Sequence, residues 1–231
     1  WRGRQPGARR PRSKTKLNTG SELLIPKEDW VHRMDIQGTD VKVLRSPIMA
    51  QAFKRVIEEF KPKSDVAIVG LCSAMRPYSK SRKWKEVIAE FGDEVDYIIN
   101  SNGGVIPMQF EDCYPYMTYD AHGERKSDKL YIVILAKRIY EFHKAHPYRF
   151  MMFHFRPTLR NCKAARIAAE RLVADGLCEE YAMLPNWTHY KEWKEVDPKL
   201  SWRRYPVLHP SNWEPFVAKT REFIERAKTN A

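Results

Sequence analysis

Short apolar runs alternate with amphipathic helical stretches along most of this chain, and this alternation constrains its fold more than any other feature. The run Val66-Ala67-Ile68-Val69, within the stretch 65–71, is apolar at consecutive positions, as in a strand buried on both faces of a parallel sheet. Further strands are expected at 95–100, 149–155 and 179–184, and helices from Pro47 to about Phe60 and at 84–91, 127–143, 158–175 and about 211–227. The sequence therefore predicts an α/β fold: an open, mostly parallel, Rossmann-like sheet of about four strands with helices on both faces.

The chain of 231 residues is long enough for one good core and is expected to form one domain with a tail. We expect a basic flexible tail at 1–20 and a single α/β catalytic domain at 21–231, whose segment 185–231 is an aromatic-rich extension. Its tryptophans suit either a partner surface or a cover over the core; they are Trp187, Trp193, Trp202 and Trp213. No apolar run reaches the roughly 18–20 residues that span a bilayer, so the protein is expected to be soluble and cytoplasmic, with no membrane partner.

The positive charge of the chain is concentrated near its beginning. The chain has 41 Lys and Arg against 29 Asp and Glu, a net charge of +12. Seven of the basic residues precede the first acid, Glu22; they are Arg2, Arg4, Arg9, Arg10, Arg12, Lys14 and Lys16. Such a segment is attracted to nucleic-acid phosphates by counterion release, although a solubilising linker would have the same composition.

Cysteine and histidine spacing does not favour a metal site or a disulfide framework. The four cysteines, Cys72, Cys113, Cys162 and Cys178, are widely separated and form no C-x-x-C pair, so reduced thiols are expected. The histidines offer His143 and His146 as a close pair, which is too few ligands for a typical zinc site. Neither a G-x-G-x-x-G nor a G-x-x-x-x-G-K-[ST] follows any expected strand, which disfavours a nucleotide-dependent enzyme, and no cofactor is expected.

Ligands of an open parallel sheet bind beyond the carboxyl ends of its strands, so the loops after the strands are the candidate site. The loop after the first strand combines a thiol with hydroxyls and cations, and its candidate residues are Cys72, Ser73, Arg76, Tyr78 and Ser81. A thiol beside several cations and a helix N-terminus favours the reactive thiolate. A buried cysteine that merely ends a strand is the simpler interpretation of Cys72 taken alone.

The later loops add polar, flexible and aromatic residues to the same edge. The candidates after the second strand are Ser101, Asn102, Gly103, Gly104, Glu111, Tyr114, Tyr119 and Asp120. The glycines would let the backbone approach a ligand closely, the carboxylates would transfer protons or bind an amine, and the rings would stack on a base. Arg156 and Arg160, after the third strand, are each candidates to hold a phosphate. Ordinary turn residues and surface ion pairs are the alternatives for each residue taken singly.

Together these residues resemble the catalytic core of archaeosine synthase over roughly 46–175. The resemblance rests on Cys72-x3-Arg76-Pro77-Tyr78-x2-Ser81, then on Ser101-Asn-Gly-Gly-Val-Ile-Pro107, Glu111, Tyr114-Pro115 and Tyr119-Asp120. It implies an archaeal transferase that modifies a 7-cyano-7-deazaguanine base in tRNA by joining the amine of free lysine to the nitrile carbon. A radical-SAM partner enzyme would complete the product, and a transglycosylase or RNA-binding subunit would assist. Modified viral DNA is a second substrate that fits the same chemistry.

Three departures from the family motif affect this interpretation. Leu71 replaces Pro, Arg76 replaces Lys with its charge kept, and Trp84 replaces a His. If that His carries a proton, this chain lacks the carrier or substitutes another group. The alternative function is therefore an inactive or DNA-directed relative that acts as a nucleic-acid-binding module.

A mechanism follows from the resemblance as a hypothesis. Cys72 adds to the nitrile or positions it, while Asp120 or Glu111 binds and deprotonates the incoming amine. The groups that would stabilise the developing nitrogen anion are Ser73, Ser81 and the amides of Gly103 and Gly104.

Overall fold

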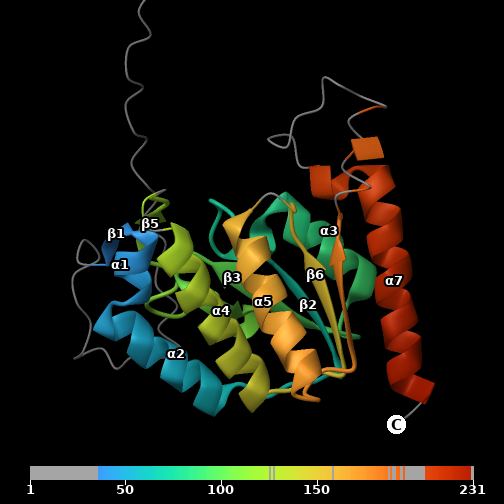
Figure 1. Cartoon of the computed structure of the whole chain (residues 1–231), viewed down its shortest axis with the longest axis horizontal. Coiled ribbons are helices and arrows are strands. Elements are labelled where there is room, and N and C mark those ends of the chain that lie inside the picture. Colours follow the sequence, from blue (N-terminus) through green and yellow to red (C-terminus); the bar gives the residue numbers. More distant parts are fainter. Residues whose placement is uncertain are drawn as a thin grey trace, which may run out of the picture.

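The structure, a computed structural model, describes residues 36–124, 126, 128–157, 159–186, 188, 191–192, 195 and 206–229. A five-stranded sheet in the order β4-β3-β2-β6-β7 forms its centre (Figure 1). The strands are β2 (Val66–Leu71), β3 (Asp96–Ser101), β4 (Gly104–Pro107), β6 (Phe150–His154) and β7 (Glu180–Leu184). Neighbouring strands run parallel except for the antiparallel pair β3 and β4. The mostly parallel sheet expected from the sequence is confirmed.

Helices cover both faces of this sheet, as predicted. They are α1 (Asp40–Leu44), α2 (Pro47–Glu59), α3 (Arg82–Phe91), α4 (Asp128–Ala145), α5 (Arg160–Ala174) and α7 (Pro210–Thr229), with short 3-10 helices η3 (Tyr78–Lys80), η4 (Met108–Phe110) and η7 (Pro206–Leu208). Figure 1 shows α2, α4 and α5 in front of the sheet and α3 behind it. The ring of Phe216 in α7 packs edge-on against Phe91 of α3, which places these two helices on the same side.

The boundaries of two helices follow directly from local chemistry. Helix α2 begins at Pro47 after Ser46, as expected from a proline preorganised for the first helical position. Its buried residues are Met49, Ala52, Phe53 and Val56. Helix α5 ends before Gly176, whose φ of +70° is the left-handed conformation that terminates many helices.

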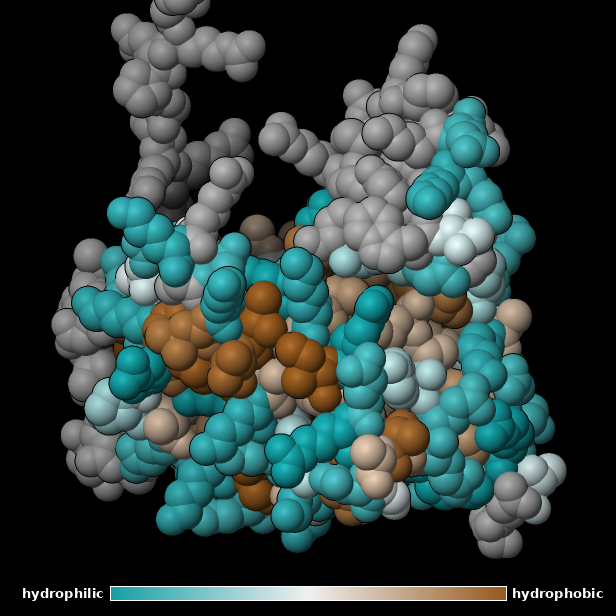
Figure 2. All heavy atoms as spheres, in the orientation of Figure 1, coloured by the Kyte–Doolittle hydropathy of each residue, from teal (hydrophilic) through white to brown (hydrophobic). Residues whose placement is uncertain are grey.

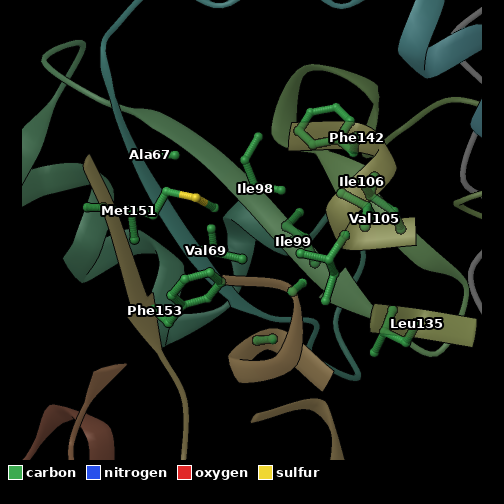
Figure 3. Close-up of a cluster of buried hydrophobic side chains, with 14 of the residues drawn as sticks. Ala67, Val69, Ile98, Ile99, Val105, Ile106, Leu135, Phe142, Met151 and Phe153 are labelled. Atoms are coloured by element: carbon green, nitrogen blue, oxygen red, sulfur yellow. The ribbon is translucent and has the colours of Figure 1, made fainter. Parts of the chain in front are cut away.

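The core lies between β2, β3, β6 and the helices in front of them. Figure 3 shows Val69, Ile98 and Phe153 pointing from neighbouring strands into one cluster with Leu135 of α4, and all four are fully buried. Each such side chain contributes about 1.5–3 kcal/mol to folding through burial. The packing of this cluster holds the carboxyl ends of the strands in fixed positions.

Three short strands were not predicted. Strands β1 (Gln37–Thr39) and β5 (Asp120–His122) form a small parallel pair apart from the main sheet. Strand β4 occupies part of the segment that the sequence analysis assigned to a ligand-binding loop. It folds back on β3 as a hairpin in which Ser101 pairs with Gly104. The two buried residues Val105 and Ile106 give β4 its place in the core, but so short a run carries little periodicity.

Several sequence predictions lie outside the described residues. These are the basic tail with Arg2, Arg4, Arg9, Arg10, Arg12, Lys14 and Lys16, and the tryptophans Trp187, Trp193 and Trp202. Trp213, in α7, is described and packs against Phe216 with the ring centroids 5.3 Å apart. Within the described part of the chain, no helix combines the length and apolar character needed to cross a membrane.

Candidate functional site

The Cys72 thiol lies where the sequence predicted it, directly after β2 at the carboxyl edge of the sheet. The backbone N–H of Cys72 donates to the carbonyl of Asn100, at the end of β3, over 3.3 Å. The Asn102 backbone and the cations Lys83 and Arg76 favour the ionised form of its sulfur. Two neighbouring strands and the loop after β2 therefore converge on this thiol.

The protonation of Cys72 differs from the sequence expectation of a favoured thiolate. Burial raises the pKa of the thiol, and this effect outweighs the opposing influence of the Asn102 amide and of the positive charges of Lys83 and Arg76. The loop does supply the expected cations, but Cys72 is half-buried. A nucleophilic Cys72 therefore requires a group that accepts its proton.

Arg76 contacts two buried tyrosines, Tyr78 and Tyr119, close to the thiol loop. The Nη1 atom of Arg76 donates to the Tyr119 carbonyl over 2.5 Å, and its guanidinium lies 4.1 Å from the centroid of the Tyr119 ring. The hydroxyls of Tyr78 and Tyr119 are 3.0 Å apart, and burial raises the pKa of both phenols. Tyr114 is also buried. None of these tyrosines presents an open face on which a base could stack without movement of its neighbours.

Glu111 is hydrogen-bonded to the same loop. Its carboxylate accepts a hydrogen bond from the backbone N–H of Ser79 over 2.8 Å, and burial raises its pKa despite the bonds that it accepts. This contact joins η4 to η3. The structure thus gives Glu111 a direct part in holding the loop that carries Cys72.

The two serines of the loop differ in their environment. Ser73 donates its hydroxyl to the Met75 carbonyl over 2.8 Å. Ser81, at the start of α3, is buried and its Oγ has no hydrogen-bond partner among the described residues. Ser81 therefore keeps an uncommitted hydroxyl next to the loop.

The glycines after β3 serve the hairpin. The Gly103 N–H donates to Ser101 Oγ over 2.9 Å, so this amide is already occupied. A Cβ added at Gly103 would lie 2.9 Å from the Tyr119 ring, and Gly104 has a φ of +114°, which side chains rarely tolerate. The space beside Gly103, expected to receive a ligand, is filled by Tyr119. Asn102 accepts a hydrogen bond from the Tyr131 hydroxyl over 3.2 Å.

The remaining predicted residues lie at different depths. Asp120 is exposed and starts β5, where it pairs in register with Gln37. Arg156 follows β6 and is half-buried, and burial lowers the pKa of its guanidinium. Arg160, the other arginine considered for phosphate binding, is held in ion pairs with Asp40 and Asp128. Its structural role matches the ion-pair alternative.

Sequence reasoning missed two polar residues at this edge. Asn100 is fully buried and neither polar atom of its side chain has a partner among the described residues. Lys83, in the first turn of α3, donates from Nζ to the Leu71 carbonyl over 2.6 Å. An amide at the end of an apolar strand was the available signal for Asn100. Nothing local distinguishes Lys83 from its exposed neighbours.

Trp84, which stands in place of the family histidine, is part of the core. Its indole N–H donates to the Leu71 carbonyl over 3.0 Å and its ring meets Tyr97 edge-on with the centroids 6.3 Å apart. Trp84 therefore fixes the end of β2 and has no free nucleic-acid-binding face.

His154, at the end of β6, stacks on Phe216 with the ring centroids 4.0 Å apart. Burial, and to a lesser extent the charge of Lys83, lowers the pKa of His154 to about 3.

A hydrophobic patch lies elsewhere, on the outer face of α4 and α5. Figure 2 shows this brown area, where Val133 is 63% and Ile167 51% exposed. The two residues line a hollow of about 500 Å³ together with Tyr140, Lys144 and Arg171. No residue of the Cys72 loop lines it. The described residues contain no group of three or more histidines, cysteines or acids arranged to hold a metal ion.

Comparison with known proteins identifies the family. The family described as "Domain of unknown function (DUF5591)" matches residues 49–176, more than half of the chain. The chain belongs to this family. The DUF5591 segment begins within α2 and ends just after α5, so it includes the Cys72 loop, Lys83 and the hairpin of β3 and β4.

Relatives of this DUF5591 protein cover only parts of it. The archaeosine synthase subunit alpha of Thermoplasma acidophilum is 30% identical over 90 residues, which are 37% of this chain and 18% of that protein. A crystal structure of AF0587, a protein of unknown function, is 19% identical, covers 64% of this chain and 50% of that chain, and has a TM-score of 0.44.

Proposed function

We propose that this DUF5591 protein is a transferase that modifies a 7-cyano-7-deazaguanine base in tRNA by adding an amine, with lysine as donor, to the nitrile carbon. The observation that carries the proposal is the similarity to archaeosine synthase subunit alpha. The reaction itself, the amine donor and the partner proteins belong to the proposal.

The geometry of the thiol loop supports this chemistry. A nitrile carbon is an electrophile, and a thiolate adds to it to give a thioimidate, which the incoming amine then attacks as the thiol leaves. Cys72 stands at the carboxyl edge of the sheet, where the cations Lys83 and Arg76 favour its ionised form. The buried hydroxyl of Ser81 and the side-chain amide of Asn100 remain uncommitted among the described residues. We assign Asp120 as the site of amine binding because it is the exposed carboxylate next to Tyr119.

The test uses tRNA that carries 7-cyano-7-deazaguanine and isotopically labelled lysine, with the digested nucleosides weighed by mass spectrometry. A lysine adduct is expected with the unaltered protein, lost in Cys72→Ala and reduced in Asp120→Ala. Cys178→Ala is the matched control, because this buried thiol precedes β7 and contacts the Arg149 carbonyl, at the edge of the sheet opposite to Cys72. Full activity of Cys72→Ala would contradict the assignment of the nucleophile.

The basic tail motivates the second candidate function, a nucleic-acid-binding module. Absence of any adduct, with tight salt-sensitive tRNA binding that is lost on deletion of residues 1–20, would favour the module. A transferase retains measurable turnover after the same deletion. Repeating the assay with DNA that contains the modified base distinguishes a DNA-directed relative from both.

A further inference from the structure

Lys83 occupies an unusual position for a lysine beside a thiol. It lies in the first turn of α3, and its Nζ is 4.4 Å from the centroid of the Trp84 ring. The same Nζ donates to the carbonyl of Leu71, the residue immediately before Cys72. Gly70 makes room for it, since a Cβ there would lie 3.2 Å from Nζ. Among the described residues, Lys83 forms no ion pair.

Lys83 interacts electrostatically with Cys72. Burial lowers the pKa of the Lys83 amine to about 7, and the influence of Cys72 opposes this shift. The other titratable or charged groups that interact with this pair are Arg76 from the loop, His154 from the end of β6, and the tyrosines Tyr78, Tyr119 and Tyr131. His154 is neutral near pH 7 because burial lowers its pKa to about 3. A substantial fraction of Lys83 is therefore unprotonated near neutral pH and able to accept a proton.

We propose that Lys83 is the proton-transfer partner of Cys72: its neutral amine accepts the thiol proton as the sulfur attacks, and its ammonium returns that proton to the substrate. The nitrile as the group attacked rests on the proposed function. In that reaction the S–H bond of Cys72 breaks and a carbon–sulfur bond forms. The electron pair released on the nitrile nitrogen takes the proton from Lys83. The product is a neutral thioimidate and a regenerated amine, so the step needs no oxidant, reductant or further reactant.

The test measures the alkylation rate of Cys72 by iodoacetamide from pH 5.5 to 9.5, with peptide mass spectrometry to follow this cysteine alone. In the unaltered protein the rate rises up to about pH 7 and then levels off, because the Cys72–Lys83 pair has then lost one proton and the ratio of its thiolate–ammonium to its thiol–amine form does not depend on pH. In Lys83→Met the plateau disappears, and the rate rises about tenfold for each pH unit across the same range. The methionine keeps the apolar stem that packs on Trp84.

Lys85→Met is the matched control, because Lys85 is an exposed lysine of the same helix. It is expected to keep the plateau. Lys83→Arg keeps a positive charge but exchanges no proton near pH 7, so it is expected to keep fast alkylation while kcat for base modification falls and KM stays unchanged. An identical pH profile in Lys83→Met and the unaltered protein overturns the proposal.

A measurement on the unaltered protein applies even if the variants fail to fold. Competitive acetylation of the lysine amines should give Lys83 a midpoint near pH 7, well below that of Lys85. A Lys83 midpoint above pH 9 also overturns the proposal. If the plateau is present but no tRNA adduct forms, the proposed function fails while the pairing of Lys83 with Cys72 stands.

Discussion

Gly70→Ala tests the packing that places Lys83 and Trp84 against the end of β2. An added Cβ would lie 2.8 Å from Cζ2 and 2.9 Å from Cη2 of the Trp84 ring, closer than real Cβ contacts. The ring is buried and hydrogen-bonded to Leu71, so it has no free space into which to move. Overpacking of this kind costs about 1–3 kcal/mol, and replacing glycine returns about 0.4–1 kcal/mol through the unfolded chain. The expected net loss is on the order of 1–2 kcal/mol.

The assays are urea unfolding and thermal unfolding, both followed by tryptophan fluorescence and circular dichroism. The melting temperature should fall by about 2–4 °C for each kcal/mol lost in a domain of this size. The decisive comparison is a double-mutant cycle with Trp84→Phe, which removes the two ring atoms that would clash. Gly70→Ala should cost clearly less stability in that background. An equal cost in both backgrounds would refute the steric explanation.

Two further predictions concern buried ionisable side chains. His143 is neutral when folded, because burial lowers its pKa to about 3, so below pH 6.5 the unfolded chain binds the additional proton and stability falls as pH falls. His143→Leu should therefore reduce the slope of unfolding free energy against pH between 5 and 6 by about 1.4 kcal/mol per unit. An unchanged slope in this variant would disprove the assignment. Arg160→Met leaves the buried Asp40 without its ion-pair partner and should cost about 3–5 kcal/mol in urea unfolding. Adding Asp40→Asn should restore part of that loss, and strictly additive costs would argue against the pairing.

The sequence by itself determined the architecture of the main sheet, because its strands are long enough to show apolar runs. Strands β2, β3, β6 and β7 and the helices between them follow from periodicity and from terminating residues such as Gly176. The position of Cys72 at the carboxyl edge followed from the same pattern. Strand β4 did not, because Gly104–Pro107 is too short for periodicity and forms only through its pairing with β3.

Tertiary structure alone decided the chemistry of the residues at that edge. The expected thiolate at Cys72 rested on nearby cations, whereas burial, which no local pattern records, raises its pKa. Burial lowers the pKa of Lys83 to about 7, although the nearby lysines Lys80 and Lys85 are exposed. Periodicity is a property of adjacent residues and can be read along the chain. The free energy of ionising a side chain depends on how much water and which charges surround it, and these are set by segments far apart in sequence.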